Sequence, residues 1–152
     1  MSSLADAFPN ADRERFASDN LVPGAVIQVF AIDTTPAKEK RLIVVGEAFD
    51  HISFACIYIN SELNLNVFPT QELHDLNPKF TADERDYLEH DSHVDCTSLH
   101  TYKKSDLLLI LKNDPTRLLG NLSDDDFIQI KKLISSARTI KASLKKTYGL
   151  FF

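Results

Sequence analysis

Short apolar runs separated by polar turns dominate residues 25–60 of the chain. AVIQVFAI follows a Pro23-Gly24 turn signal, and RLIVVGEAF and SFACIYIN follow the polar segment DTTPAKEK. Their length and their β-branched and aromatic content predict three strands, each with at least one buried face. The next run, LNLNVF at residues 63–68, alternates apolar and polar positions and predicts an edge or half-buried strand.

Helical patterns dominate the rest of the chain. Apolar residues recur every three or four positions after Ser123, three Asp fill the first turn, and Gly149 follows, which predicts a long helix over residues 123–148. The capping box TADE predicts a short helix from Thr81 to about Leu88. Strands first and helices later predict an α+β protein with a mainly antiparallel sheet.

Three shorter segments give weaker signals. Asn10 predicts the cap of a short helix over residues 11–17, and residues 92–97 fit a strand. The run at residues 107–111 fits either a short helix or a buried strand, and Asp114-Pro115 ends it.

Length and composition predict a single cytoplasmic domain over residues 1–152. A chain of 152 residues that is 43% hydrophobic can bury a core and does not resemble a disordered protein. The amino terminus lacks the charged and apolar regions of a secretory signal, and no apolar run is long enough to span a membrane. Cys56 and Cys96 are expected to be free thiols.

The charge is unevenly divided along the chain. Residues 1–100 hold 7 Lys and Arg against 17 Asp and Glu, whereas residues 101–152 hold 10 against 5. This uneven distribution of charge permits a basic face despite the net charge of −5. An ordinary solvated helix with cations near its C-terminal end would give the same distribution. The overall acidity argues against broad nucleic-acid binding through charge alone.

No local motif specifies a metal or a nucleophile. His90, Asp91, His93, Asp95 and His100 are ligand types for zinc or iron, but strand alternation turns His90 away from the others. The chain has no CxxC pair, no phosphate-binding glycine loop and no GxSxG segment. Neither a metal nor another cofactor is therefore expected.

Several segments taken in order carry a resemblance. PGAVIQVF, KRLIVVG, CIYINSE, DSHVDCTSL and LLGNLSDDDFIQIKKLI, within residues 22–140, resemble the MazF/PemK family of toxin ribonucleases. The resemblance implies an SH3-like antiparallel β-barrel of the MazF/CcdB kind with a long C-terminal helix and additional short helices. Residues 1–20 then form an N-terminal helical extension and residues 66–90 an insertion.

The resemblance also implies a function. Such a protein cleaves single-stranded RNA without a metal, is neutralised by an antitoxin protein and often forms a homodimer, for which the tail Leu150-Phe151-Phe152 is a candidate contact. Arg41 stands where the family has its catalytic arginine, although Leu42 replaces the proline that follows it, and Ser61 stands where the family has its catalytic Thr or Ser.

Further residues are expected near this pair. Ser92 and Asp91 are expected to line the same groove, and Lys103 and Lys104, beside Tyr102, are candidates for contacts to RNA phosphates. Three other interpretations stay open: a non-catalytic interaction module of this fold, a gyrase poison like CcdB, and a structural subunit of a defence or regulatory assembly. The chain lacks the Trp-Gly-Ile tail of CcdB, which ranks gyrase poisoning lower.

Overall fold

The computed structural model describes residues 10–151, so residues 1–9 of the expected N-terminal extension and Phe152 of the apolar tail lie outside it. The strands are β1 (Ala25–Ala31), β2 (Lys38–Glu47), β3 (Ser53–Asn60), β4 (Lys79–Phe80), β5 (Ser92–Val94), β6 (His100–Lys103) and β7 (Leu118–Asn121). The helices are α1 (Asn10–Asn20), α2 (Gln71–Asp75), α3 (Lys104–Asn113), α4 (Asp124–Ser136) and α5 (Ala142–Thr147), with 3₁₀ turns η2 (Ala82–Glu84) and η3 (Pro115–Arg117).

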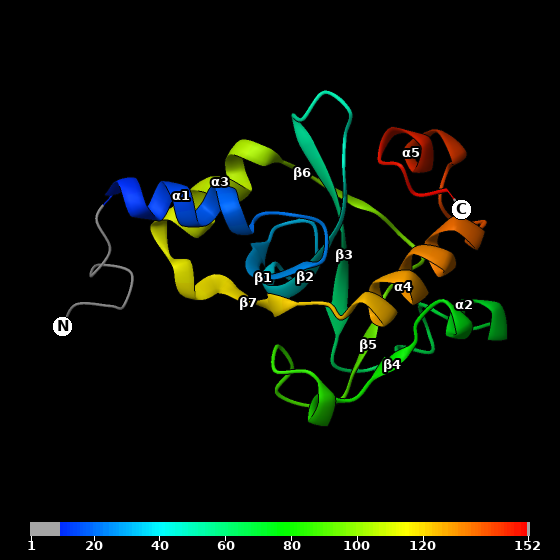
Figure 1. Cartoon of the computed structure of the whole chain (residues 1–152). Coiled ribbons are helices and arrows are strands. Elements are labelled where there is room, and N and C mark those ends of the chain that lie inside the picture. The colour runs from blue at the N-terminus through cyan, green and yellow to red at the C-terminus, as the bar shows by residue number, and fades with distance from the viewer. Residues whose placement is uncertain (1–9, 152) are drawn as a thin grey trace.

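The strands form one curled antiparallel sheet in the order β4-β5-β3-β2-β1-β7. β6 pairs with the first half of β3 and β5 with its last residues, so two short strands share one side of the long central strand (Figure 1). The expected α+β class with an antiparallel sheet is confirmed. The sheet is an open half-barrel, and β7 ends it beside β1.

Helices cover both faces of the sheet, which explains the continuous apolar runs. On one face, Leu42 and Val44 pack in a core with α1 and α3 through Ala17, Leu107 and Leu111. On the other face, Ile43 and Val45 pack in a core with α4 and α5 and with residues 76–88. Alternate side chains of β2 therefore enter different cores, and both are buried.

The expected helix over residues 123–148 is wrong in its extent, because the chain forms two helices there. α4 ends at Ser136, its C-cap Ala137 has an extended backbone, and α5 begins after Lys141. The reason is tertiary: the buried Lys145 ammonium donates to the carbonyl oxygens of Ser135 at 2.8 Å and Ala137 at 2.7 Å. Lys145 thus satisfies carbonyl groups at the end of α4, which requires the chain to fold back.

Local turns replace two other expected elements. Residues 63–68 form no strand, because Asn64 closes a turn by accepting the backbone N–H groups of Asn66 and Phe68. The expected helix from Thr81 to Leu88 is only the short turn η2, since Thr81 makes no side-chain cap. The strand expected over 92–97 ends at Val94, and the ambiguous run 107–111 is helical in α3.

The two ends of the chain and several short elements also differ from the expected structure. The helix expected over 11–17 is present and extends to Asn20, while α2, β6 and β7 had no expected counterpart. Leu150 is buried in the chain's own core rather than exposed for a dimer contact, and Phe151 is half exposed. Among residues 10–151, no helix combines the length and apolarity that crossing a membrane requires.

Candidate functional site

Arg41, Ser61 and Ser92 line one hollow of about 250 Å³, which we call the Arg41 hollow. Arg41 comes from the middle of β2, Ser61 follows the end of β3, and Ser92 begins β5. Arg41 and Ile59 are register partners on neighbouring strands, and Ser61 lies two residues beyond Ile59. Strand pairing therefore brings Arg41 and Ser61 together, although twenty positions separate them in the sequence. The remaining lining residues are Lys38, Glu39, Lys40, Ile59 and His90.

The Arg41 guanidinium is only partly engaged. Its side chain is 23% exposed, and Nη2 lies 3.2 Å from Oε1 of Glu89, whose own side chain is 77% exposed. Its buried Nε has no hydrogen-bond partner among the described residues. A buried donor without an acceptor is uncommon in folded proteins, so the residues around Arg41 do not fully satisfy its guanidinium group.

Two residues of this hollow come from the end of the expected insertion and from the strand after it, namely His90 and Ser92. The buried Ser92 hydroxyl donates to the carbonyl oxygen of His90 at 2.9 Å. Nδ1 of His90 lies 3.0 Å from the carbonyl oxygen of Asp91, a contact that favours the tautomer with the proton on Nδ1. His90 Nε2 is then the nitrogen that can accept a proton.

Asp91 does not line this hollow, contrary to expectation. Its carboxylate accepts the backbone N–H of Ala82 at 2.9 Å and lies 3.8 Å from the Lys79 ammonium. These contacts hold the start of η2 against β4. Asp91 immediately precedes β5, and the alternation of side chains along an extended chain places Asp91 and Ser92 on different sides, which is the physical reason for the difference.

Lys103 and Lys104 are also outside the hollow. Lys103 is the register partner of Ser53, at the opposite end of β3 from Ser61, so about 23 Å of strand separates them. The Lys104 ammonium pairs with Glu47 at 3.0 Å and lies 5.8 Å from the centre of the Phe54 ring. Lys103 and Lys104 were expected near this hollow only because of the family resemblance. The pairing of β6 with the far half of β3 separates both lysines from the hollow.

A second hollow of about 610 Å³ adjoins the first and shares Lys38, Lys40 and Ser61 with it. The Lys40 side chain donates to the side-chain oxygen of Asn60 and lies 5.7 Å from the centre of the Tyr58 ring. Burial lowers the pKa of the Lys40 ammonium, the nearby Lys38 lowers it further, and Asp95 opposes the shift. Three cations, Lys38, Lys40 and Arg41, therefore surround the junction of the two hollows.

A polar cluster around Tyr58 lies beside Lys40, on the face of β3 opposite the one that carries Ile59. The Tyr58 hydroxyl donates to Asp33 at 2.7 Å and lies 2.5 Å from the Tyr102 hydroxyl, and the His100 ring stacks on Tyr58 with 3.9 Å between centres. His100 Nδ1 lies 2.7 Å from the second oxygen of Asp33. Burial raises the pKa of Asp33, but hydrogen bonds from Tyr58 and His100 outweigh it and leave that pKa below its ordinary value.

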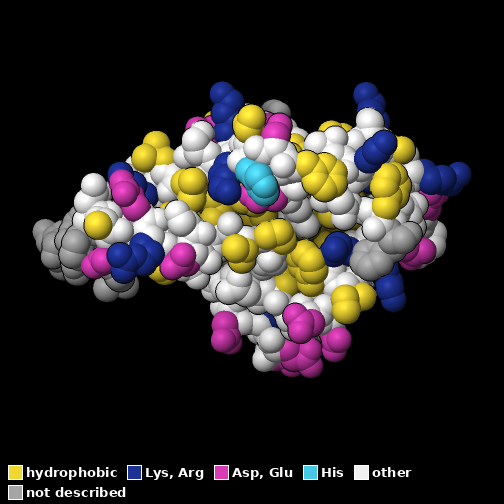
Figure 2. Space-filling model, turned by 45° about the horizontal axis from the view of Figure 1, so that its top comes forward, with side chains coloured by type: hydrophobic (Ala, Val, Ile, Leu, Met, Phe, Trp, Pro, Cys, Tyr) yellow, Lys and Arg dark blue, Asp and Glu magenta, His cyan; other side chains and the backbone are white. Residues whose placement is uncertain are grey.

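Charge on the surface is less polarised than the sequence suggests. Cations from the basic C-terminal part are engaged in ion pairs, namely Lys104–Glu47, Lys112–Glu14, Arg117–Glu39 and Arg138–Glu72. On the face in Figure 2, acidic side chains gather on the lower lobe, which corresponds to the segment around η2 at the bottom of Figure 1. Basic side chains are scattered in this view and form no continuous patch.

Sequence reasoning missed Lys38, Lys40 and His90 as members of the site. The lysines precede Arg41 directly in KEKR, so a local cluster of cations was available as a signal. His90 was considered only as a metal ligand. Among residues 10–151, no three His, Cys, Asp or Glu side chains form a group that could hold a metal ion.

The two cysteines take no part in the site. Cys56 and Cys96 are free and buried, and burial raises the pKa of both thiols well above the ordinary value. A thiol that stays protonated is a poor nucleophile.

The arrangement favours binding of an anion between cations and hydroxyl groups. Arg41 supplies a guanidinium group, Ser61 a hydroxyl and His90 an imidazole ring, all around one hollow. Groups of these types can bind and polarise a phosphate group. Compared with known proteins, the chain matches no family model, no curated protein and no solved structure.

Proposed function

We propose that this protein is a MazF/PemK-like toxin, a metal-independent endoribonuclease that cleaves single-stranded RNA and is neutralised by an antitoxin. Its curled sheet would then be an SH3-like barrel of the MazF/CcdB kind. The observation that carries the proposal is the Arg41 hollow, where Arg41, Ser61 and His90 line the same space. A homodimer belongs to the proposal only through the resemblance.

In the proposed reaction, the ribose 2′-oxygen attacks the adjacent phosphorus and the bond from phosphorus to the 5′-oxygen breaks. His90 Nε2 accepts the proton of the 2′-hydroxyl, and the leaving 5′-oxygen takes a proton from water. The products are a 2′,3′-cyclic phosphate and a 5′-hydroxyl. Arg41 stabilises the negative charge that develops on the equatorial phosphate oxygens, because its planar fork matches their geometry.

Ser61 and the two lysines have supporting roles. The Ser61 hydroxyl donates to a phosphate oxygen and orients the scissile group. Lys38 and Lys40 line both hollows, so they attract the phosphates on either side of the cleaved bond. The adjoining hollow is lined by residues 60–65 and is large enough to accept an unstacked base.

Cleavage of a mixed single-stranded RNA pool in the presence of EDTA tests the proposal. We expect discrete cuts by the purified protein, loss of the cuts with Arg41→Ala, and full activity with Arg138→Ala. Arg138 is a matched control because it pairs with Glu72 on the surface and is 81% exposed. Cuts that persist in Arg41→Ala would reject this hollow as the active site.

A second candidate is a non-catalytic interaction module of the same fold in a toxin-antitoxin or defence system. The ion pair between Arg41 and Glu89 favours it, because a carboxylate already occupies part of the guanidinium. The two functions are distinguished by the same assay: absence of cleavage in every RNA of the pool, together with a stable protein partner, supports the module.

A further inference from the structure

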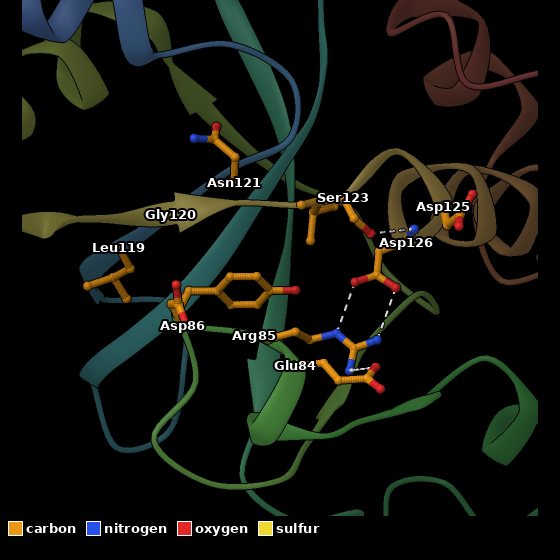
Figure 3. A pocket seen from close by; sticks show the side chains of 11 residues that line it. Glu84, Arg85, Asp86, Leu119, Gly120, Asn121, Ser123, Asp125 and Asp126 are labelled. Carbon is orange, nitrogen blue, oxygen red and sulfur yellow. Dashed lines mark hydrogen bonds and ion pairs between the residues drawn. The ribbon is translucent and has the colours of Figure 1, made fainter.

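A third pocket, of about 590 Å³, lies between β7, the segment around η2 and the start of α4 (Figure 3). It shares no lining residue with the Arg41 hollow or the hollow beside it. One wall is the strand β7 with Leu119, Gly120 and Asn121, and the opposite wall is residues 84–87. We call it the β7 pocket.

The strand that lines this pocket is an edge of the sheet. β7 pairs with β1 on one side and has no strand on its other side within residues 10–151. The N–H of Leu122 donates to the carbonyl oxygen of Gly24 at 2.9 Å, so by alternation the backbone groups of Asn121 point away from β1. An edge of this kind can pair with an extended segment of another chain.

The walls of the pocket are strongly acidic. Glu84, Asp86 and Asp125 are exposed on it, and the cation Arg85 is neutralised by Asp126 through hydrogen bonds of 2.9 Å and 3.0 Å. Figure 3 shows this pair joining the η2 segment to the first turn of α4 across the pocket. The net charge of the lining is therefore negative, which suits a cationic occupant and opposes a nucleic acid.

A buried polar group also remains unsatisfied at this place. Tyr87 lines the pocket and is 6% exposed, and its hydroxyl has no hydrogen-bond partner among the described residues. Buried hydroxyl groups are normally paired. This buried hydroxyl belongs to the wall of the pocket and lies close to the charges of Arg85 and Asp126.

We propose that the β7 pocket binds an extended, Lys- and Arg-rich segment of a partner protein, which pairs with the free edge of β7 and places its cations among Glu84, Asp86 and Asp125. Side chains alternate along an extended segment, so every second residue faces the acidic wall. The proposal does not depend on ribonuclease activity, since its pocket is separate from the Arg41 hollow.

Fluorescence anisotropy with labelled ten-residue peptides, in which Lys alternates with Val or Thr, tests the proposal on the full chain. We expect saturable binding that weakens about tenfold in the variant Glu84→Gln/Asp86→Asn/Asp125→Asn. The control variant Asp19→Asn/Asp106→Asn/Asp83→Asn loses the same charge at exposed positions that do not line the pocket, and it should keep the affinity. Arg41→Ala should also keep it, which separates this site from the proposed active site.

A second peptide with N-methyl groups on alternate amides distinguishes strand pairing from simple ion pairing. We expect it to bind at least about tenfold more weakly, because it cannot donate to the edge of β7. Equal binding of both peptides, equal affinity of the two charge variants, or competition by spermine as effective as by the peptide would overturn the proposal. Binding of single-stranded RNA at this pocket, lost in the triple variant, would overturn it as well.

Discussion

Glu89 holds Arg41 by an ion pair, with 3.2 Å between Oε1 and Nη2. Glu89 belongs to the segment between β4 and β5, whereas Arg41 lies in the central strand β2. The carboxylate occupies one side of the guanidinium and leaves the buried Nε without an acceptor. An exposed carboxylate on the arginine competes with a phosphate for the same cation.

Removing this competitor should increase activity toward RNA. We predict that Glu89→Gln raises the cleavage rate at subsaturating RNA by about fivefold, the equivalent of about 1 kcal/mol for an exposed ion pair. Asp83→Asn is the matched control, since it lies in the same segment and lines none of the hollows. A rate for Glu89→Gln at or below that of the unchanged protein would show that Glu89 assists and does not compete.

The Ser61 hydroxyl should matter for the rate and not for the fold. Ser61 is exposed at the end of β3, so Ser61→Ala should leave the free energy of unfolding unchanged while lowering kcat by about 100-fold. Ser61→Thr keeps the hydroxyl and should retain most of the rate. Single-turnover cleavage separates this effect from RNA binding, and equal rates for Ala and Thr would remove Ser61 from the mechanism.

The pair Arg85–Asp126 should contribute to stability. Both side chains are 14% exposed, the guanidinium makes two hydrogen bonds to the carboxylate, and it lies 4.2 Å from the centre of the Phe80 ring. We expect Arg85→Met and Asp126→Asn each to lower the free energy of unfolding by about 2–3 kcal/mol. The double variant should cost at least about 1 kcal/mol less than the sum, as measured by urea unfolding.

The exposed pair Arg138–Glu72 provides the control for this cycle. Its side chains are 81% and 50% exposed, so the same cycle should give a coupling of about 0.5 kcal/mol or less. A coupling for Arg85 and Asp126 as small as this would mean that the pocket wall is not held by the ion pair.

Gly46 should not tolerate a side chain. A Cβ at this position would lie 2.6 Å from the backbone oxygen of Tyr148, because the C-terminal segment packs closely against β2 there. We predict that Gly46→Ala lowers the free energy of unfolding by about 2 kcal/mol, because backbone must shift to relieve the contact. Gly120→Ala, where the nearest atom lies at 3.4 Å, should cost less than about 1 kcal/mol in the same measurement.

The polar cluster of Asp33, Tyr58, Tyr102 and His100 should make the free energy of unfolding depend on pH in the acidic range. The pKa of the folded Asp33 carboxyl lies below its ordinary value of 3.8, so its contribution is complete above about pH 4 and is lost as the pH falls through the lower, folded pKa. We expect Asp33→Asn to lower the free energy of unfolding by about 1 kcal/mol at pH 7, a value reduced for partial exposure. The difference should shrink as the pH falls below about 4; a difference that is the same at pH 3 as at pH 5 would contradict the assignment.

The apolar pattern of the chain determined the central part of the fold. SFACIYIN predicts the observed β3 without error, and AVIQVFAI and RLIVVGEAF predict the positions of β1 and β2. Local signals sufficed here because these β-branched and aromatic runs suit strands that are buried on both faces of a sheet. Ser123 and the three Asp after it likewise predicted the start of α4, where the Ser123 hydroxyl accepts the N–H of Asp126.

Only the tertiary structure decided where α4 ends, which strands pair and which residues share a hollow. The break between α4 and α5 depends on Lys145, which reaches carbonyl groups eight to ten residues earlier in the chain. Strand pairing brought Arg41, Ser61 and Ser92 together, and it separated Lys103 from them. Such relations arise from long-range hydrogen bonding and packing, which residue order along the chain does not encode locally.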